Sequence, residues 1–214
     1  MARRRNIMSK IQHTLSDINS VVFAFIIMFA VTAAWGTAFA ADSDLGDVLS
    51  ELQQNGRVVV MRHTQTVPGV GDPNGFKLND CATQRNLNQL GIDQAKRFGA
   101  ALNRAGVRIG RVLVSEWCRA DDTARLILKA AGVGDFPRIK FWQLNNVWDD
   151  RSRIKEQVAA VRAAISEWRG PGVLLMVSHG VTIRPVVGRS TSQGGFFVLQ
   201  PSGTSFEIIA EGRL

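Results

Sequence analysis

Two histidines of this chain each follow directly on a short run of mainly apolar residues. His63 comes after residues 57–62, and His179 comes after residues 173–178. Because such runs are typical of buried strands, we expect each imidazole at the carboxyl end of a strand, where ligands bind in open α/β sheets. A neutral imidazole can act as a nucleophile or as a general base. The pair therefore predicts a catalytic or binding site.

Two arginines accompany these histidines. Arg62 directly precedes His63, and Arg119 comes just after a predicted strand over residues 111–115. Guanidinium groups donate paired hydrogen bonds to phosphate oxygens and stay charged at any working pH. A helix predicted to begin near Arg119 adds free backbone N–H groups and the positive end of its dipole. Together these groups predict an anion pocket suited to a phosphoryl group, which an imidazole could carry covalently.

Three motifs, taken in order, resemble the signature of the histidine phosphatase superfamily, which has the phosphoglycerate-mutase-like fold. They are Arg62-His63-Thr64, residues 115–124 and Ser178-His179-Gly180. The superfamily has Arg-His-Gly after the first strand, Ser-x-x-x-Arg-x-x-x-Thr-Ala after the second, and a late His-Gly. The resemblance covers essentially all of residues 41–214. It implies a phosphatase without metal or other cofactor, in which His63 becomes phosphohistidine and Arg62, Arg119 and His179 complete the phosphate pocket.

Further residues are candidates for substrate contact, namely Thr64, Arg85, Glu116 and Asn146. Thr64 stands where the family has glycine, so it must adopt the same backbone angles or contribute its hydroxyl. Arg85 is either a surface residue at a helix start or a contact for the substrate phosphate. Residues 80–91 and 117–119 are similar to a periplasmic subgroup that includes lipopolysaccharide-core heptose phosphatases.

The proton donor for the leaving group is missing from its expected place. Many relatives have an acid in a Leu-x-Glu setting after the third strand, whereas residues 144–146 read Leu-Asn-Asn, and amides are not proton-donating acids. The sequence offers these substitutes: Asp72, Asp80, Glu116, Asp149 and Asp150. Two alternatives remain. The leaving group could need no acid, as in a phosphohistidine-type substrate, or the pocket could bind phosphoanions with little turnover.

Other interpretations of the histidines are also open. Both could be core residues satisfied by backbone carbonyls. A metal site with two histidines has no support from Asp, Glu or Cys at ligand spacing. A mutase is less favoured than a phosphatase, because the expected acid is missing and glycolytic chemistry does not suit an exported protein.

Strand and helix patterns alternate along the chain. This alternation predicts a three-layer α/β/α sandwich with a mostly parallel central sheet and a C-terminal hairpin. We expect strands over residues 57–62, 111–115, 139–144 and 173–178, with the hairpin over 196–200 and 206–210. We expect helices over residues 44–54, 91–105, 119–131 and 154–168. The Gly- and Pro-rich loop 68–80 and the segment after Leu144 are expected to carry specificity.

Residues 1–40 resemble a secretory signal peptide. Basic residues 3–5 and 10 precede an uncharged apolar run, and Ala38-Phe39-Ala40 fits a cleavage site after Ala40. The alternative is a retained membrane anchor, because residues 20–41 carry no charge. Cleavage would remove four Lys/Arg and one Asp, leaving 174 residues with a net charge of +5 instead of +8. We therefore expect one exported domain, residues 41–214, in the periplasm or secreted.

The only two cysteines, Cys81 and Cys118, flank the predicted pocket. They would either form a disulfide that stiffens its rim or remain free thiols. Lys and Arg are spread along the chain rather than gathered in runs, which favours a small phosphorylated substrate over nucleic acid. Membrane contact is expected only through an uncleaved leader. Substrate identity and oligomeric state have no readable signal.

Overall fold

A six-stranded sheet with helices on both faces forms the centre of the computed structural model, which describes residues 45–147 and 151–214. The strands are β1 (Val58–Arg62), β2 (Ile109–Val114), β3 (Ile139–Lys140), β4 (Val173–Ser178), β5 (Gly195–Ser202) and β6 (Ser205–Arg213). The α-helices are α2 (Gln89–Arg104), α3 (Cys118–Ala130), α4 (Ile154–Ser166) and α5 (Gly180–Val187), and the 3-10 helices are η1 (Cys81–Thr83) and η2 (Trp142–Leu144). Residues 45–52 form a further helical segment. From Gly46 onward, these elements belong to one compact unit, Gly46–Leu214.

The strands lie in the order β3-β2-β4-β1-β5-β6. β3, β2, β4 and β1 are parallel, whereas β5 runs antiparallel to β1 and forms a hairpin with β6. This confirms the predicted fold class. β1 and β4 are neighbours, with Arg62 opposite Ser178, so the residues that follow both strands meet at one edge of the sheet.

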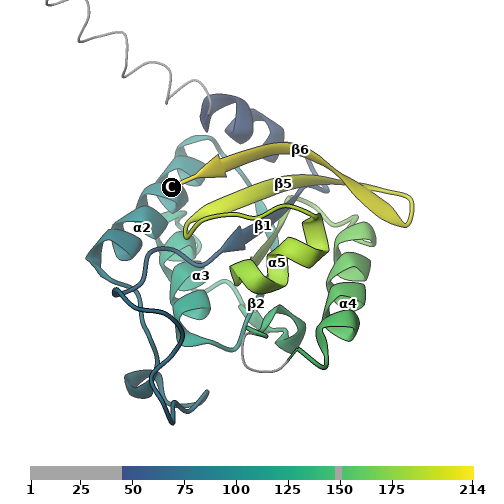
Figure 1. Cartoon of the computed structure of the whole chain (residues 1–214). Coiled ribbons are helices and arrows are strands. Elements are labelled where there is room, and N and C mark those ends of the chain that lie inside the picture. Colours follow the sequence, from purple (N-terminus) through teal and green to yellow (C-terminus); the bar gives the residue numbers. More distant parts are fainter. Residues whose placement is uncertain (1–44, 148–150) are drawn as a thin grey trace, which may run out of the picture. The chain divides into compact units, whose positions relative to one another are not determined.

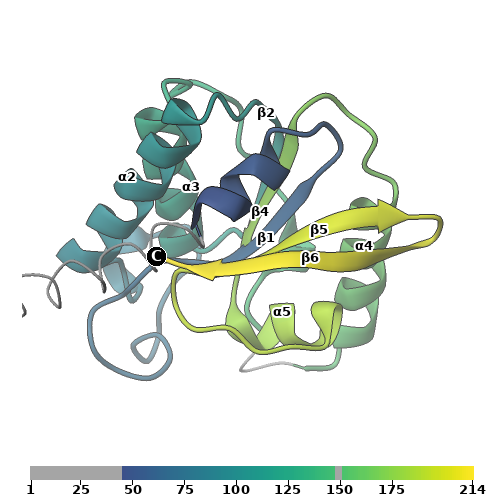
Figure 2. The same cartoon turned by 90° about the horizontal axis from the view of Figure 1, so that it is seen from above.

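Side chains of the central strands are buried on both faces of the sheet. In β1, Val59 and Met61 pack into the core beneath α2 and α3, while Val58 and Val60 pack into the core beneath α4 and α5. Figures 1 and 2 show these two helix pairs on opposite faces. Each fully buried side chain of this size contributes about 1.5–3 kcal/mol. The two cores therefore hold the carboxyl end of β1 firmly in place.

Two elements differ from the sequence prediction. The strand expected over residues 139–144 is wrong beyond Lys140, because Trp142–Leu144 forms η2 instead. Helix α5 was not predicted at all. It has only eight residues, is rich in β-branched side chains and contains Pro185, all of which disfavour a helix locally. It forms because Ile183 and Val186 are buried in the core beneath α4 and α5.

The predicted signal peptide, with its cleavage site after Ala40, lies outside the described residues and stays a prediction. Within residues 45–147 and 151–214, the helices are too short or too polar to cross a bilayer.

Candidate active site

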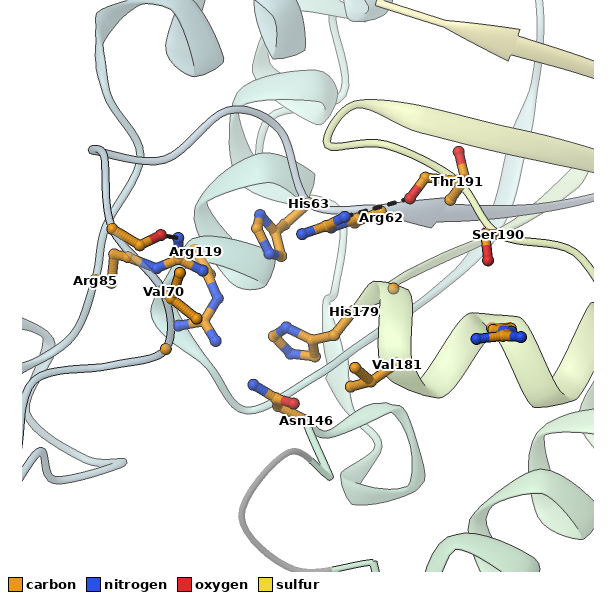
Figure 3. Close-up of a pocket in the computed structure, with 14 residues that line it drawn as sticks. Arg62, His63, Val70, Arg85, Arg119, Asn146, His179, Val181, Ser190 and Thr191 are labelled. Atoms are coloured by element: carbon orange, nitrogen blue, oxygen red, sulfur yellow. Dashed lines mark hydrogen bonds between the residues drawn. The ribbon is translucent and has the colours of Figure 1, made fainter.

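His63 and His179 lie side by side at the carboxyl ends of β1 and β4. Their ring centroids are 5.3 Å apart, and the rings meet edge to face. The backbone N–H of His63 donates to the carbonyl of Ser178 over 3.0 Å, which fixes the two strand ends together. Both imidazoles are buried, yet both line a cavity of about 410 Å³ (Figure 3). The expected meeting of the two histidines at one edge of the sheet is therefore correct.

The proton on His63 is placed by its hydrogen bond. Nδ1 lies 2.9 Å from the carbonyl oxygen of Thr64. Because a carbonyl only accepts, Nδ1 must carry the hydrogen, which leaves the lone pair of the neutral ring on Nε2. Burial, followed by the charges of Arg119, Arg62 and Arg85, lowers the pKa of His63 to about 3, despite the opposing effect of the Thr64 bond. His63 is thus an uncharged imidazole with a free nucleophilic nitrogen at neutral pH.

His179 is held in the opposite tautomer. Ser115 Oγ donates to Asn145 Oδ1 over 3.1 Å and lies 2.8 Å from His179 Nε2. Because the Ser115 hydroxyl donates its hydrogen to the Asn145 side chain, its oxygen can only accept from His179 Nε2–H. The lone pair of His179 is therefore on Nδ1. This buried Nδ1 has no hydrogen-bond partner among the described residues. Burial and the nearby His63 and arginines lower the pKa of His179 well below 6.5. Nδ1 is therefore available to take up a proton when an anion enters.

Four guanidinium groups line the same cavity, from Arg62, Arg85, Arg119 and Arg184. None of the described lining residues is Asp or Glu. Arg62 Nη1 donates to the carbonyl of Thr191 over 3.3 Å. Four cations facing two neutral imidazoles make a strongly anion-attracting site.

Gly180 makes room for Arg62. A Cβ at this position would lie 3.2 Å from Arg62 Nη1 and 3.4 Å from its Cζ, so any larger residue would require the guanidinium to shift by a few tenths of an ångström. Gly180 and Val181, in the first turn of α5, also line the cavity. The amino-terminal end of α5 therefore faces the site, although the sequence prediction placed a helix start only near Arg119.

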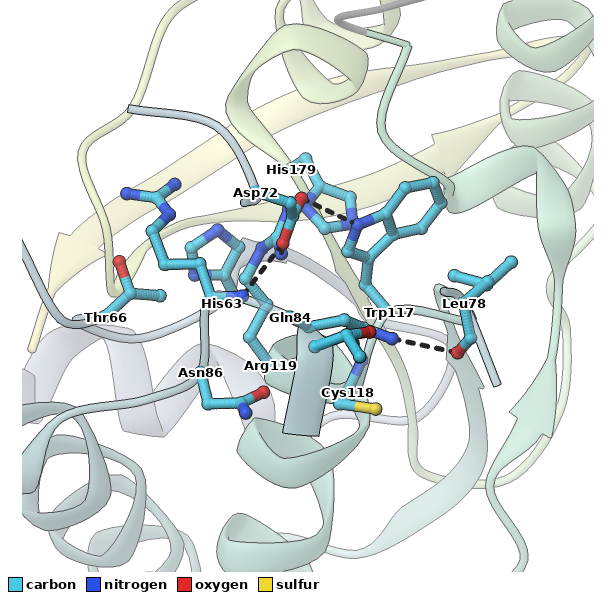
Figure 4. Close-up of polar contacts among 12 residues, drawn as sticks. His63, Thr66, Asp72, Leu78, Gln84, Asn86, Trp117, Cys118, Arg119 and His179 are labelled. Carbon is cyan, nitrogen blue, oxygen red and sulfur yellow. Dashed lines mark hydrogen bonds and ion pairs between the residues drawn. The ribbon is translucent and has the colours of Figure 1, made fainter. Parts of the chain in front are cut away.

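Asp72 holds Arg119 from behind the cavity. Its Oδ1 accepts from Arg119 Nη1 over 2.7 Å and its Oδ2 accepts from Nη2 over 3.1 Å. Trp117 Nε1 and the backbone N–H of Arg85 also donate to this carboxylate, each over 3.0 Å (Figure 4). Although burial alone would raise the pKa of Asp72, the bonds from Arg119, Arg85 and Trp117 lower it. Asp72 is therefore ionised near neutral pH and positions Arg119, whose buried Nε has no partner in the described part of the chain.

Two predicted substrate contacts are placed elsewhere. Thr64 is buried, and both its N–H and its Oγ1 lie 3.1 Å from Thr123 Oγ1, so it ties β1 to α3 and does not line the cavity. No non-glycine residue among those described has a positive φ, so this position does not need glycine. Glu116 also lies outside the lining, where it accepts from Asn145 Nδ2 over 2.6 Å. The other two expected contacts, Arg85 and Asn146, do line the cavity.

Three of the five candidates for the general acid do not line the cavity. Asp72 is ionised and paired with Arg119. Asp80 is exposed and caps η1 by accepting from the N–H of Ala82 over 3.1 Å. Neither of them, nor Glu116, lines the cavity. Asp149 and Asp150 lie outside the described residues and stay predictions.

A disulfide joins Cys81 to Cys118, with the two Cα atoms 5.7 Å apart. This confirms the bridge that was one of two expectations, and the free thiols are excluded. It ties η1, at the end of the loop that carries Asp72, to the first residue of α3, directly before Arg119. Gln84 Oε1 accepts from the N–H of Cys118 over 3.0 Å, so this one N–H of the helix start is not free for a ligand.

Other residues of the site were missed by sequence reasoning. They are Val181, Arg184, Ser190 and Thr191, whereas Gly69, Val70 and Gly71 belong to the loop 68–80 that was expected to carry specificity. Gly180, Val181 and Arg184 occupy one face of α5 at helical spacing. That signal could have been found only after a helix had been assigned there.

Comparison with known proteins gives the same family as the motifs. Residues 58–143 match the family model of the histidine phosphatase superfamily, branch 1. The protein histidine phosphatase SixA complexed with tungstate is similar in structure, at a TM-score of 0.51 and 18% identity over 73% of this chain and 96% of that chain. The open reading frame Rv3214 from Mycobacterium tuberculosis has a TM-score of 0.54 and 17% identity over 75% and 98%. The ecdysone phosphate phosphatase from Bombix mori in complex with tungstate has a TM-score of 0.54 and 14% identity over 72% and 92%.

At these identities the solved structures establish only the fold. The family model and the order of the motifs, in contrast, compare the amino-acid sequence itself, including the site residues. Arg62, His63 and Arg119 lie within the matched segment, and His179 joins them at the neighbouring strand end. By this match and by its motifs, the chain is similar to the histidine phosphatase superfamily.

Proposed function

We propose that this protein is an exported phosphomonoesterase that works through a phosphohistidine on His63. One observation carries the proposal: the free Nε2 of an uncharged, buried imidazole faces a cavity lined by four arginines. The match of residues 58–143 to the superfamily model supports a phosphatase. Two of the similar structures contain tungstate, a tetrahedral oxyanion with the same charge as hydrogen phosphate, which is consistent with a site for a tetrahedral anion.

The proposed reaction has two steps. His63 Nε2 attacks phosphorus, and the bond from phosphorus to the ester oxygen breaks as the nitrogen–phosphorus bond forms. Water then attacks the phosphohistidine, which releases inorganic phosphate and restores the neutral imidazole. Arg62 and Arg119 donate to the non-bridging oxygens in both steps. His179 Nδ1 can accept the proton of a phosphate monoanion, and the imidazolium that results stabilises the phosphoryl charge.

The proposed substrate is a small phosphorylated metabolite or an envelope sugar phosphate. Similarity to the periplasmic subgroup with lipopolysaccharide-core heptose phosphatases supports the second of these. Leaving groups that depart without a proton do not depend on a general acid. Aryl phosphates and phosphohistidine have such leaving groups, so they are suitable first substrates.

Two observations support export. Residues 1–40 have the order of a secretory signal peptide, and Cys81 is bonded to Cys118. Structural disulfides form and persist in oxidising compartments such as the bacterial periplasm. If the full-length chain is expressed in a bacterium, the purified protein should begin at Ala41 and fractionate with periplasmic proteins. An intact amino terminus in the membrane fraction would instead favour a retained anchor.

Activity is tested with 4-nitrophenyl phosphate over a pH series, using protein from the full-length sequence and the variant His63→Ala. We expect hydrolysis by the natural protein, its loss in the variant, and a phosphoprotein trapped by alkaline quenching. Activity that survives the substitution would refute the role of His63. Tungstate binding without any hydrolysis would favour the alternative, a protein that binds phosphoanions with little turnover.

A further inference from the structure

We propose that Arg184 forms a second anion subsite and that the natural substrate carries an anionic group on its leaving-group side. This inference rests on the proposed function, because it takes His63 as the end of the cavity that receives the phosphoryl group. It adds the chemical class of the rest of the substrate.

The cavity is larger than a phosphoryl group requires. Its volume is about 410 Å³. It also lies within the range of about 300–1,000 Å³ typical of small-molecule sites. A phosphoryl group bound to Arg62, Arg119 and the two histidines therefore leaves space for the remainder of a substrate.

Helix α5 connects the two ends of this space. It begins beside His179, and Gly180, Val181 and Arg184 share the face that lines the cavity. Arg184 comes four residues after Gly180, which is a rise of about 6 Å along the helix axis. Arg184 thus lines the cavity about one helical turn beyond Gly180, the residue that follows His179.

The side of the cavity near Thr191 is polar. In Figure 3, Ser190 and Thr191 lie on one side of the two histidines, while Val70 and Arg85 lie on the other. The hydroxyl groups of Ser190 and Thr191 are hydrogen-bond donors, and the cavity that they share with Arg184 has no described Asp or Glu in its wall. A guanidinium with hydroxyl donors is a common receptor for a carboxylate or a second phosphate.

The charge of Arg184 is uncompensated among the described residues. Its exposed guanidinium has no hydrogen bond or ion pair with any of them, and the helix carries no acidic residue in its first turn. Arg189 lies just beyond the same helix and differs from Arg184 in two ways. It forms an ion pair of 2.8 Å with Glu211, and it does not line the cavity. Arg189 is therefore a matched control that removes the same charge from the same region.

The test compares phenyl phosphate with 4-carboxyphenyl phosphate, using the natural protein, Arg184→Ala and Arg189→Ala. We expect the natural protein to prefer the carboxylated ester in kcat/KM. Arg184→Ala should lose about 10- to 100-fold more in kcat/KM on that ester than on phenyl phosphate, the range for a charge-assisted hydrogen bond. Arg189→Ala should change neither. Equal losses on both esters, or no loss, would overturn the subsite.

A binding experiment separates this proposal from the failure of turnover. Phenylphosphonate and 4-carboxyphenylphosphonate cannot be hydrolysed, so calorimetry measures their Kd whether or not the protein is an enzyme. A preference for the carboxylated ligand that disappears only in Arg184→Ala supports the subsite even if no ester is hydrolysed. Equal Kd values for the two phosphonates in the natural protein would refute it, even if His63 proves to be the nucleophile.

Discussion

The buried imidazole of His63 should make the stability of this protein depend on pH. Burial and the surrounding arginines lower its pKa from 6.5 to about 3 in the folded protein, whereas the unfolded chain has the ordinary value. Between these values only the unfolded state binds a proton at this position. The contribution of the neutral imidazole is therefore complete above pH 6.5 and is lost as the pH falls from 6.5 toward 3.

The size of the effect at pH 5 follows from the unfolded-state pKa. That pH lies about 1.5 units below 6.5, and each unit corresponds to about 1.4 kcal/mol. His63 should thus lower the free energy of unfolding by about 2 kcal/mol between pH 7.5 and pH 5. The pKa of His63 in the folded state has little effect on this difference, because it lies about two units below pH 5. His179 acts in the same direction, since burial also lowers its pKa.

The assay is urea unfolding at pH 7.5 and pH 5.0, in buffers without phosphate, for the natural protein and His63→Gln. The glutamine side chain does not titrate, so the variant should lose about 2 kcal/mol less than the natural protein on acidification. His179→Gln should also reduce the loss. Equal losses in the natural protein and His63→Gln would refute the assignment of a neutral, buried His63.

Three further perturbations have effects that can be worked from the structure. Replacing Cys81 and Cys118 together by serine should lower the free energy of unfolding by about 4 kcal/mol, as expected from a sequence separation of 37 residues; a loss below about 1 kcal/mol in urea would contradict this. Gly180→Ala should weaken tungstate binding, measured by calorimetry, because the added Cβ lies 3.2 Å from a nitrogen of Arg62; an unchanged Kd would show that the guanidinium can move freely. Asp72→Asn breaks a buried ion pair and should cost roughly 3–5 kcal/mol in unfolding experiments. If the free energy of unfolding of this variant equals that of the natural protein, the ion pair between Asp72 and Arg119 does not stabilise the fold.

Much of the site could be predicted because it depends on local sequence. Apolar runs ending at Arg62 and Ser178 predict buried strands, and the residues after parallel strands necessarily meet at one edge of the sheet. His63 and His179 could therefore be placed beside each other without a structure. The helix face of α5 could not be predicted, because the local sequence disfavours a helix and only packing against the sheet stabilises it. Arg184 was missed for that reason.

The sequence by itself determined which groups stand at the strand ends, and hence the fold class and the resemblance to the histidine phosphatase superfamily. Only the tertiary structure decided how those groups are bonded. Asp72 and Arg119 are 47 residues apart, and Thr64 and Thr123 are 59 residues apart. Such partners depend on how a loop closes over the sheet, which no local pattern encodes. The structure therefore turned Asp72 from a candidate acid into a support for Arg119, and Thr64 from a candidate contact into a link between β1 and α3.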